Sequence, residues 1–330
     1  MKRTEHRHPW VWSAPEIASR REWQFELTQH DISEIERAVG ISRATGISLD
    51  AMTTKDFPLP GLAATLAGVG ASLREGAGIA LIRGLPLDAF QRSDIERIFC
   101  GLGTYLGTSV SQSHRGDRLG RVMDIGEPGR YYTVGGALEM HMDPADIVGL
   151  LCLRKAIAGG ESRVASAIAV HETIAAERPD LLRHLQDGFF YASASQDRVA
   201  GDMPVSRERI PVYSEVGGNL ACFYLPISIR SAEKHGKPLS LAEREALTLV
   251  NEVASRPEHC LEMDLAPGDI QLLNNRRILH GRNDYTDAST SEDKREMLRL
   301  WLMADQWPPR PQRWNFHGVS DRAAGGIPRG

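Results

Sequence analysis

The sequence predicts an α+β fold in which helices come first and an antiparallel β-barrel or sandwich follows. Early apolar residues recur at helical spacing, whereas short strand-like runs separated by Gly, Pro, Asn and Asp dominate after about residue 105. No internal repeat, low-complexity tract or linker divides the 330 residues, so we expect one domain over 1–330. We expect a helical N-terminal part over about 1–105, a barrel core over about 106–305 and a C-terminal tail over 306–330.

Two helices and one buried strand are predicted in the N-terminal part. Residues 28–39 carry apolar side chains every three or four positions, and Thr28 or Asp31 can cap the helix. Residues 93–106 show the same spacing. Between these helices, residues 78–87 have the sequence GIALIRGLPL, a short apolar run that glycine and proline close, which is typical of a buried strand.

The predicted barrel consists of seven strand-like runs: RVMDIG, GLLCLRKAI, FYASAS, IPVYSEV, LACFYLP, CLEMDLAPGDIQLLNN and MLRLWLMA. The runs IPVYSEV and LACFYLP are separated by GGN, which predicts a hairpin. Two helices should interrupt the strands. One runs from about Ser166 to Leu185, and the other begins at Ser240, which forms a capping box with Glu243.

Composition favours a soluble protein of the reduced cytoplasm for which nucleic acid is an unlikely partner. The net charge is −4 and the pI about 6.3, so there is no basic excess for nucleic acid. Four widely spaced cysteines contain no CxxC pair, which argues against a zinc knuckle and a disulfide framework. The first ten residues lack an apolar export signal, and no run is long enough to span a bilayer. A homo-oligomer is compatible with this composition, which does not determine the oligomeric state.

A histidine and a carboxylate two residues apart, with a distant second histidine, form the most informative pattern. The motif HMD at 141–143 and His280 match the two-His-one-carboxylate facial triad, which leaves positions on Fe(II) open for a cosubstrate and oxygen. In an extended segment, positions i and i+2 project to the same side, so both side chains of the motif can reach one ion. Alternatively, Asp143 only caps a turn before Pro144 and His280 is a hydrogen-bonded core histidine.

Other protein classes could use the same donors. A non-catalytic or sensing metal-binding β-barrel protein could hold zinc or manganese there, since histidine and carboxylate bind several divalent ions. A structural site would have no use for a carboxylate receptor, so an arginine inside the barrel would favour an enzyme. A cupin-type oxygenase ranks last, because residues 138–168 contain no histidine besides His141.

Five motifs follow one another along the chain: HMD at 141–143, GGES at 159–162, PGDIQLLNN at 267–275, HGR at 280–282 and LRLWL at 298–302. This order resembles the taurine catabolism dioxygenase (TauD/TfdA) family of Fe(II)/2-oxoglutarate-dependent oxygenases, and the likeness begins near residue 33. The resemblance implies a double-stranded β-helix, or jelly-roll, core with flanking helices and a helical insert. It also implies that Fe(II) is held by His141, Asp143 and His280.

The same resemblance implies an enzyme that oxidises a small molecule by hydroxylation or related C–H oxidation. Its cosubstrates would be 2-oxoglutarate and O2, and its coproducts succinate and CO2. Arg299 of LRLWL would pair with the far carboxylate of 2-oxoglutarate, and Ser162 of GGES would donate a hydroxyl hydrogen bond to it. Arg299 alternates with Leu298 and Leu300, so it points into the barrel if those leucines face outer helices. Arg295 is the rival for this role, and Arg299 could instead pair with a surface acid.

Some positions depart from the family pattern. Ala137 replaces an asparagine of the taurine-cleaving members, and QSHRGD at 112–117 lacks their sulfonate contacts, so taurine is not the expected substrate. Asp143 occupies the position that halogenases of this type leave to Gly or Ala, which disfavours halogenation. Candidate substrate contacts, each of which also fits a packing or surface role, are Tyr131, Tyr132, His114, Arg115 and Phe223.

Overall fold

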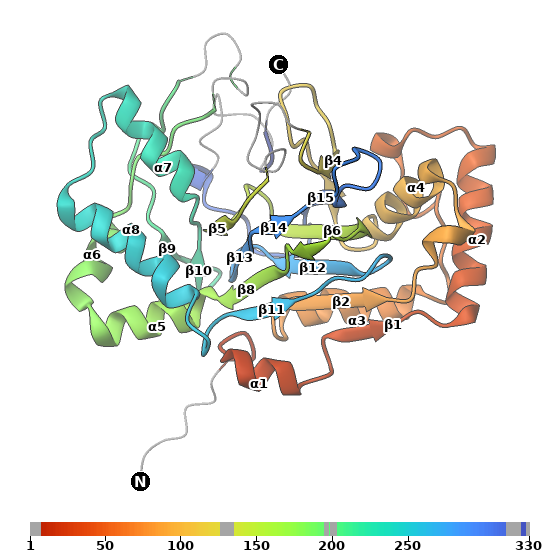
Figure 1. Ribbon diagram of the computed structural model, residues 1–330, viewed down its shortest axis with the longest axis horizontal. Helices are drawn as coiled ribbons and strands as arrows, with labels where there is room; N and C mark the ends of the chain where they lie inside the picture. The colour runs from red at the N-terminus through yellow and green to blue at the C-terminus, as the bar shows by residue number, and fades with distance from the viewer. Residues whose placement is uncertain (1–7, 126–134, 195–197, 199–202, 315–324, 328–330) are drawn as a thin grey trace.

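The structure is a computed structural model that describes residues 8–125, 135–194, 198, 203–314 and 325–327. It has a mixed α+β fold, as the sequence predicted. Strands occupy the middle of the molecule, and helices lie on both sides of them (Figure 1). Within the described residues, no helix is long and apolar enough to cross a membrane.

The larger sheet has seven strands, most of them antiparallel neighbours. Its strands in spatial order are β1 (Gln24–Glu26), β2 (Ile79–Arg83), β12 (Ile270–Asn274), β6 (Ile147–Arg154), β15 (Glu296–Met303) and β3 (Thr108–Ser109), with β4 (Leu119–Val122) also paired to β15. The β15–β6 register places Arg299 opposite Leu150, and the β12–β6 register places Gln271 opposite the same leucine. These three side chains therefore share one row across the sheet.

The smaller sheet carries both metal-binding histidine candidates. Its strands in spatial order are β11 (Leu261–Met263), β8 (Ser162–Ser166), β13 (Ile278–Arg282) and β5 (Leu138–His141). The β13–β5 pairing places His280 directly opposite His141. A Cβ at Gly281 would lie 2.6 Å from the carbonyl oxygen of Leu138, so the glycine permits close approach of the neighbouring strand. Two further antiparallel pairs are β9 (Tyr213–Val216) with β10 (Asn219–Cys222) and β7 (Ala158–Gly159) with β14 (Tyr285–Thr286).

Apolar side chains fill the space between the two sheets. Leu273, Cys152 and Met297 from the larger sheet pack in one cluster with Val164 and Ile278 from the smaller sheet. Each fully buried aliphatic side chain contributes about 1.5–3 kcal/mol relative to exposure. This core holds the sheets together without any contribution from a metal.

Helices of the N-terminal part cover the outer face of the larger sheet. They are α2 (Gln29–Ala44), α3 (Ala63–Arg74) and α4 (Arg92–Gly103), whose apolar faces pack with those of β6, β12 and β15. Leu298 and Leu300 belong to this outer cluster, which confirms that they face helices. Thr28 caps α2 and forms a capping box with Asp31. The sequence analysis missed α3, because Gly68 and Gly70 weaken its helix propensity.

A second group of helices lies on the far side of the smaller sheet (Figure 1): α5 (Ala167–Glu177), α6 (Pro179–Asp187), α7 (Pro226–Ala232) and α8 (Leu241–Ala254). The single helix predicted over 166–185 was wrong. It breaks at Arg178, because Pro179 lacks the N–H that would continue the helix. The capping box of Ser240 and Glu243 at the start of α8 is confirmed.

Strand predictions were correct where an apolar run pairs with a neighbour. The predicted β9–β10 hairpin is present, and the strand near residue 81 is β2. Over its described residues, 190–194, the run FYASAS is not a strand, since only Ala192 there forms an isolated bridge, with Val205. The run LACFYLP leaves the strand after Cys222, and Pro226 begins α7. Short helical elements are α1 (Ala14–Ser19), η1 (Leu49–Ala51), η2 (Leu87–Ala89), η5 (Glu233–His235) and η6 (Gln312–Trp314).

Candidate metal centre

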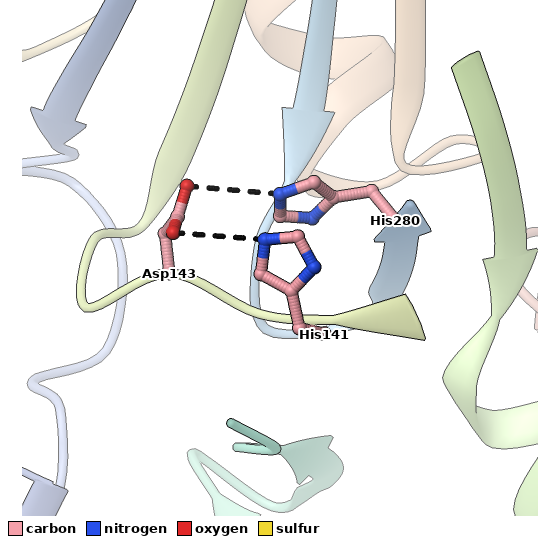
Figure 2. A group of neighbouring side chains, drawn as sticks. All are labelled: His141, Asp143 and His280. Atoms are coloured by element: carbon pink, nitrogen blue, oxygen red, sulfur yellow. Dashed lines mark ion pairs between the residues drawn. The ribbon is translucent and has the colours of Figure 1, made fainter. Parts of the chain in front are cut away.

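Two histidines and one aspartate converge at one edge of the smaller sheet (Figure 2). His141 ends β5, His280 lies in β13, and Asp143 follows β5 in the connection to β6. Nε2 of His141 lies 3.9 Å from Oδ1 of Asp143, and Nε2 of His280 lies 3.6 Å from Oδ2. Met142 packs in the helical cluster on the other face, so the predicted alternation of the HMD motif is confirmed.

The turn that carries Asp143 is fixed by one buried amide side chain. Oδ1 of Asn275 accepts a hydrogen bond from the Asp143 N–H at 3.1 Å. Nδ2 of Asn275 donates to the carbonyl oxygens of Asp143 and Ala145. Because Asn275 is 1% exposed, these bonds are shielded from water and hold the carboxylate in a defined position.

Burial and neighbouring charges set the protonation of the centre. Burial, followed by the proximity of His280, lowers the pKa of His141 to about 4, so this ring is neutral near pH 7. Burial acts to raise the pKa of Asp143, but Arg299 and the two histidines hold it well below its usual range. The centre therefore offers a neutral imidazole and an ionised carboxylate, the forms that bind metals.

The donor set fits a divalent ion. One ligand atom from each of the three residues lies within 4.8 Å of the others, so a small movement could bring all three around one ion. Nδ1 of His141 is 2.8 Å from the carbonyl oxygen of Glu139, and a carbonyl only accepts, so the proton belongs on Nδ1. Nε2 then keeps its lone pair for the metal. Two imidazoles and one carboxylate form the set typical of non-haem Fe(II) oxygenases.

Arg299 lies at the metal end of the interior. Its Nη1 is 3.7 Å from Oδ2 of Asp143, and its Nε donates to Oε1 of Gln112 at 2.8 Å. Its guanidinium carbon lies 4.5 Å from the centre of the Trp301 ring. The prediction that Arg299 points inward is confirmed.

Arg295 lies directly before β15, and its buried guanidinium lies over the ring of Tyr285. It is 4% exposed, and its Nη2 donates to the carbonyl oxygen of Gly160 at 3.3 Å. Among the described residues, its Nη1 has no hydrogen-bond partner. Burial, followed by the positive charge of Arg282, lowers the pKa of Arg295. A Cβ at Gly160 would lie 3.0 Å from Nε of Arg295, so glycine is needed where this guanidinium meets the backbone.

Ser162 lies two residues after Gly160, in β8. Its side chain is buried, and Oγ donates to Oε1 of Gln271 at 2.9 Å. Because Gln271 and Arg299 face the interior from the same row of the larger sheet, the hydroxyl lies in the space between the two sheets. A serine, a glutamine and two arginines thus make this part of the interior polar.

Three of the five candidate substrate contacts lie among the described residues. His114 is partly exposed, and its Nδ1 is buried without a hydrogen-bond partner among the described residues. Arg115 is exposed. Phe223 is 1% exposed and stacks between Tyr191 and Trp314, which fits the packing alternative. Tyr131 and Tyr132 lie outside the described residues.

A facial-triad donor set at the edge of two facing sheets defines the class of non-haem Fe(II) oxygenases. The chain belongs to the family described as taurine catabolism dioxygenase TauD, TfdA family, whose model matches residues 44–301. It is therefore an Fe(II)- and 2-oxoglutarate-dependent dioxygenase that acts on a small molecule. This membership disfavours the alternative of a non-catalytic metal-binding protein.

Two proteins resemble the chain in sequence, and two solved structures resemble it in fold. The FR-33289 synthase of Streptomyces rubellomurinus is 30% identical over 324 residues, covering 95% of each chain. A taurine hydroxylase-like protein of Stachybotrys chartarum is 25% identical, covering 90% of this chain and 79% of that protein. An asparagine oxygenase solved with Fe(II), 3-hydroxyasparagine and succinate shares the fold, with a TM-score of 0.67 and 18% identity over 85% of this chain and 93% of that one. The oxygenase OrfP, solved with Fe and alpha-ketoglutaric acid, has a TM-score of 0.65 and 16% identity over 93% and 99%.

Three residues that support the centre escaped the sequence analysis. Asn275 and Trp301 bind Asp143, and Gln112 binds Arg299. Trp301 could have been found, because it lies two residues after Arg299 in LRLWL and so points to the same side of the strand. Nothing in the local sequence of Gln112 or Asn275 indicates their long-range partners.

Proposed function

We propose that His141, Asp143 and His280 bind Fe(II) and that the chain hydroxylates a small molecule, or carries out a related C–H oxidation. The observation that carries this proposal is the convergence of the three donors within 4.8 Å. When bound, iron and 2-oxoglutarate supply oxidation of a C–H bond by O2, with release of succinate and CO2. Residues 1–330 would act as one domain with a double-stranded β-helix core and the helical insert α5–α8.

Arg295, Ser162 and Arg299 would bind 2-oxoglutarate together. Arg295 is suited to the far carboxylate, because a buried guanidinium with a free N–H gains a charge-assisted hydrogen bond from an anion. Ser162 would donate to that carboxylate in place of Gln271. Arg299 would contact the chelating end, because it lies beside Asp143. This differs from the far-carboxylate role that the motif order first favoured for Arg299.

The substrate would be a small molecule related to an amino acid or another natural product. Two relatives support this class, since one is named an FR-33289 synthase and another is an asparagine oxygenase. His114 and Arg115 remain candidate contacts, while Phe223 would act through packing. Tyr131 and Tyr132 are also candidates.

The oligomeric state would be tested by mass measurement in solution.

A succinate-release screen tests the proposal. The purified chain would be incubated with Fe(II), ascorbate, 2-oxoglutarate and a panel of amino-acid-derived, carboxylic and natural-product compounds. Succinate should form with at least one compound and in equal amount to an oxidised product. If His280→Ala releases succinate as fast as the unaltered protein, the proposed ligand set is wrong.

A further inference from the structure

Trp301 forms a hydrogen bond to the carboxylate of Asp143. Its Nε1 donates to Oδ2 at 2.9 Å, and the indole is 3% exposed. The same oxygen lies 3.7 Å from Nη1 of Arg299, whose guanidinium stacks on the indole. Donors from two alternate positions of β15 therefore meet at one oxygen of a candidate metal ligand.

The two oxygens of Asp143 are thereby made unequal. Oδ2 accepts the indole hydrogen bond, whereas Oδ1 lies 3.9 Å from Nε2 of His141. A hydrogen bond to one oxygen uses a lone pair that would otherwise be available to a metal, and it fixes the rotation of the carboxyl plane. A carboxylate bound through one oxygen occupies one coordination position, and one bound through both occupies two.

We propose that Trp301 is a positioning residue that makes Asp143 bind the metal through Oδ1 alone. This inference rests on the proposed metal site and goes beyond it by assigning a role to a residue outside the ligand set. Keeping Asp143 to one coordination position leaves the remaining positions for the cosubstrate and oxygen. Arg299 assists by holding the indole ring from one face and by its charge near Oδ2.

Residues 325–327 pack beside Trp301 and the turn that carries Asp143. Ile327 is 5% exposed and packs in one cluster with Trp301 and Val148. The N–H of Gly326 donates to the carbonyl oxygen of Pro144, directly after Asp143, and the N–H of Ile327 donates to that of Ser111 at 2.8 Å. These three residues therefore link the indole to the turn that carries Asp143.

Trp301→Phe tests the proposal, because it keeps an aromatic ring and removes only the N–H and one ring. Trp23→Phe is the matched control, since Nε1 of Trp23 donates at 3.0 Å to a backbone carbonyl, that of Ile17. Fe(II) affinity would be measured anaerobically on the full chain, together with the d–d absorption of the Co(II)-loaded protein. We expect Trp301→Phe to weaken Fe(II) binding by about 10-fold or more. We also expect weaker Co(II) absorption, because a second bound oxygen raises the coordination number.

The outcomes separate this inference from the proposed metal site. If the unaltered protein binds no Fe(II), both are wrong. If the unaltered protein binds Fe(II) and the Fe(II) affinity of Trp301→Phe is within about twofold of its affinity, Trp301 has no positioning role. The same conclusion follows if Trp301→Phe loses no more Fe(II) affinity than Trp23→Phe. An unchanged Co(II) spectrum would overturn binding through Oδ1 alone. Ile327→Ala should weaken Fe(II) binding less than Trp301→Phe. If Ile327→Ala has no effect on Fe(II) binding, residues 325–327 have no part in positioning Trp301.

Discussion

Nε2 of His280 lies 3.6 Å from Oδ2 of Asp143, although the two residues come from distant parts of the chain. The β13–β5 pairing and the bonds of Asn275 bring them together. The interior core between the sheets is apolar and contains none of the three ligands. The fold therefore prepares the metal site, and folding should not depend on the metal.

Removal of either histidine should abolish metal binding without unfolding the chain. His141→Ala and His280→Ala should each lose stoichiometric Fe(II) binding in anaerobic calorimetry, because two remaining ligands hold the ion weakly. Circular dichroism should remain that of the unaltered protein. The exposed His235 provides a control, and His235→Ala should bind Fe(II) normally. Normal Fe(II) affinity in His280→Ala would exclude that residue from the site.

The two arginines should respond differently to removal of the far carboxylate of the cosubstrate. The unaltered protein should prefer 2-oxoglutarate to 2-oxopentanoate, which keeps the chelating end and lacks that carboxylate. Arg295→Ala should abolish this preference and raise the Michaelis constant for 2-oxoglutarate by more than two orders of magnitude. The reason is that loss of one partner of a buried charge pair costs about 3–5 kcal/mol.

Arg299→Ala is the matched comparison. It should weaken both oxo acids by similar factors, because its guanidinium lies beside Asp143 at the chelating end. If Arg299→Ala abolishes the preference and Arg295→Ala does not, the far carboxylate lies at Arg299, as the motif order first indicated. Binding can be measured anaerobically, so that the result does not depend on turnover.

Oxygen, and not chloride, should enter the products. Asp143 supplies the carboxylate at the position where a halide would have to bind, so abundant chloride should not be transferred to the substrate. Mass spectrometry after turnover under labelled O2 should find one labelled atom in succinate. The substrate should gain oxygen, lose hydrogen or lose a C–heteroatom bond. A chlorinated product, or unlabelled succinate, would contradict the assignment.

Glu296 should make stability depend on pH. Its buried carboxylate pairs with Arg92, Arg121 and Arg154 at 2.8–2.9 Å. Burial acts to raise its pKa, but the pairs with Arg92 and Arg121 lower the pKa below the ordinary 4.5. A lowered folded pKa stabilises the protein above the unfolded pKa, and this contribution is lost as the pH falls through the folded pKa.

Glu296→Gln should therefore reduce the free energy of unfolding at pH 7 by about 1–3 kcal/mol. This is below the value of a fully buried pair, because the three arginines are 39–62% exposed. Urea unfolding at several pH values should show the difference from the unaltered protein shrinking below pH 4.5. Glu177→Gln, which removes an exposed pair with Arg256, should have little effect. A difference that does not change with pH would exclude titration of Glu296 as its cause.

The sequence by itself determined the local features of the protein. The spacing in HMD placed His141 and Asp143 on one side of an extended segment and Met142 on the other, because side chains alternate along a strand. The alternation in LRLWL placed Arg299 inward. The capping candidates Thr28 and Ser240 predicted the starts of α2 and α8, since a cap depends on residues only a few positions apart.

Only the tertiary structure decided which distant side chains meet. The sequence could not show that Arg299 lies 3.7 Å from Oδ2 of Asp143 or that Arg295 donates to the carbonyl oxygen of Gly160. The support of Asp143 by Asn275 and Trp301 likewise comes from segments far away in the chain. Parity sets the face of a sheet on which a side chain lies. Its neighbours across the interior depend on the register and packing of both sheets, which many weak contacts throughout the chain determine together.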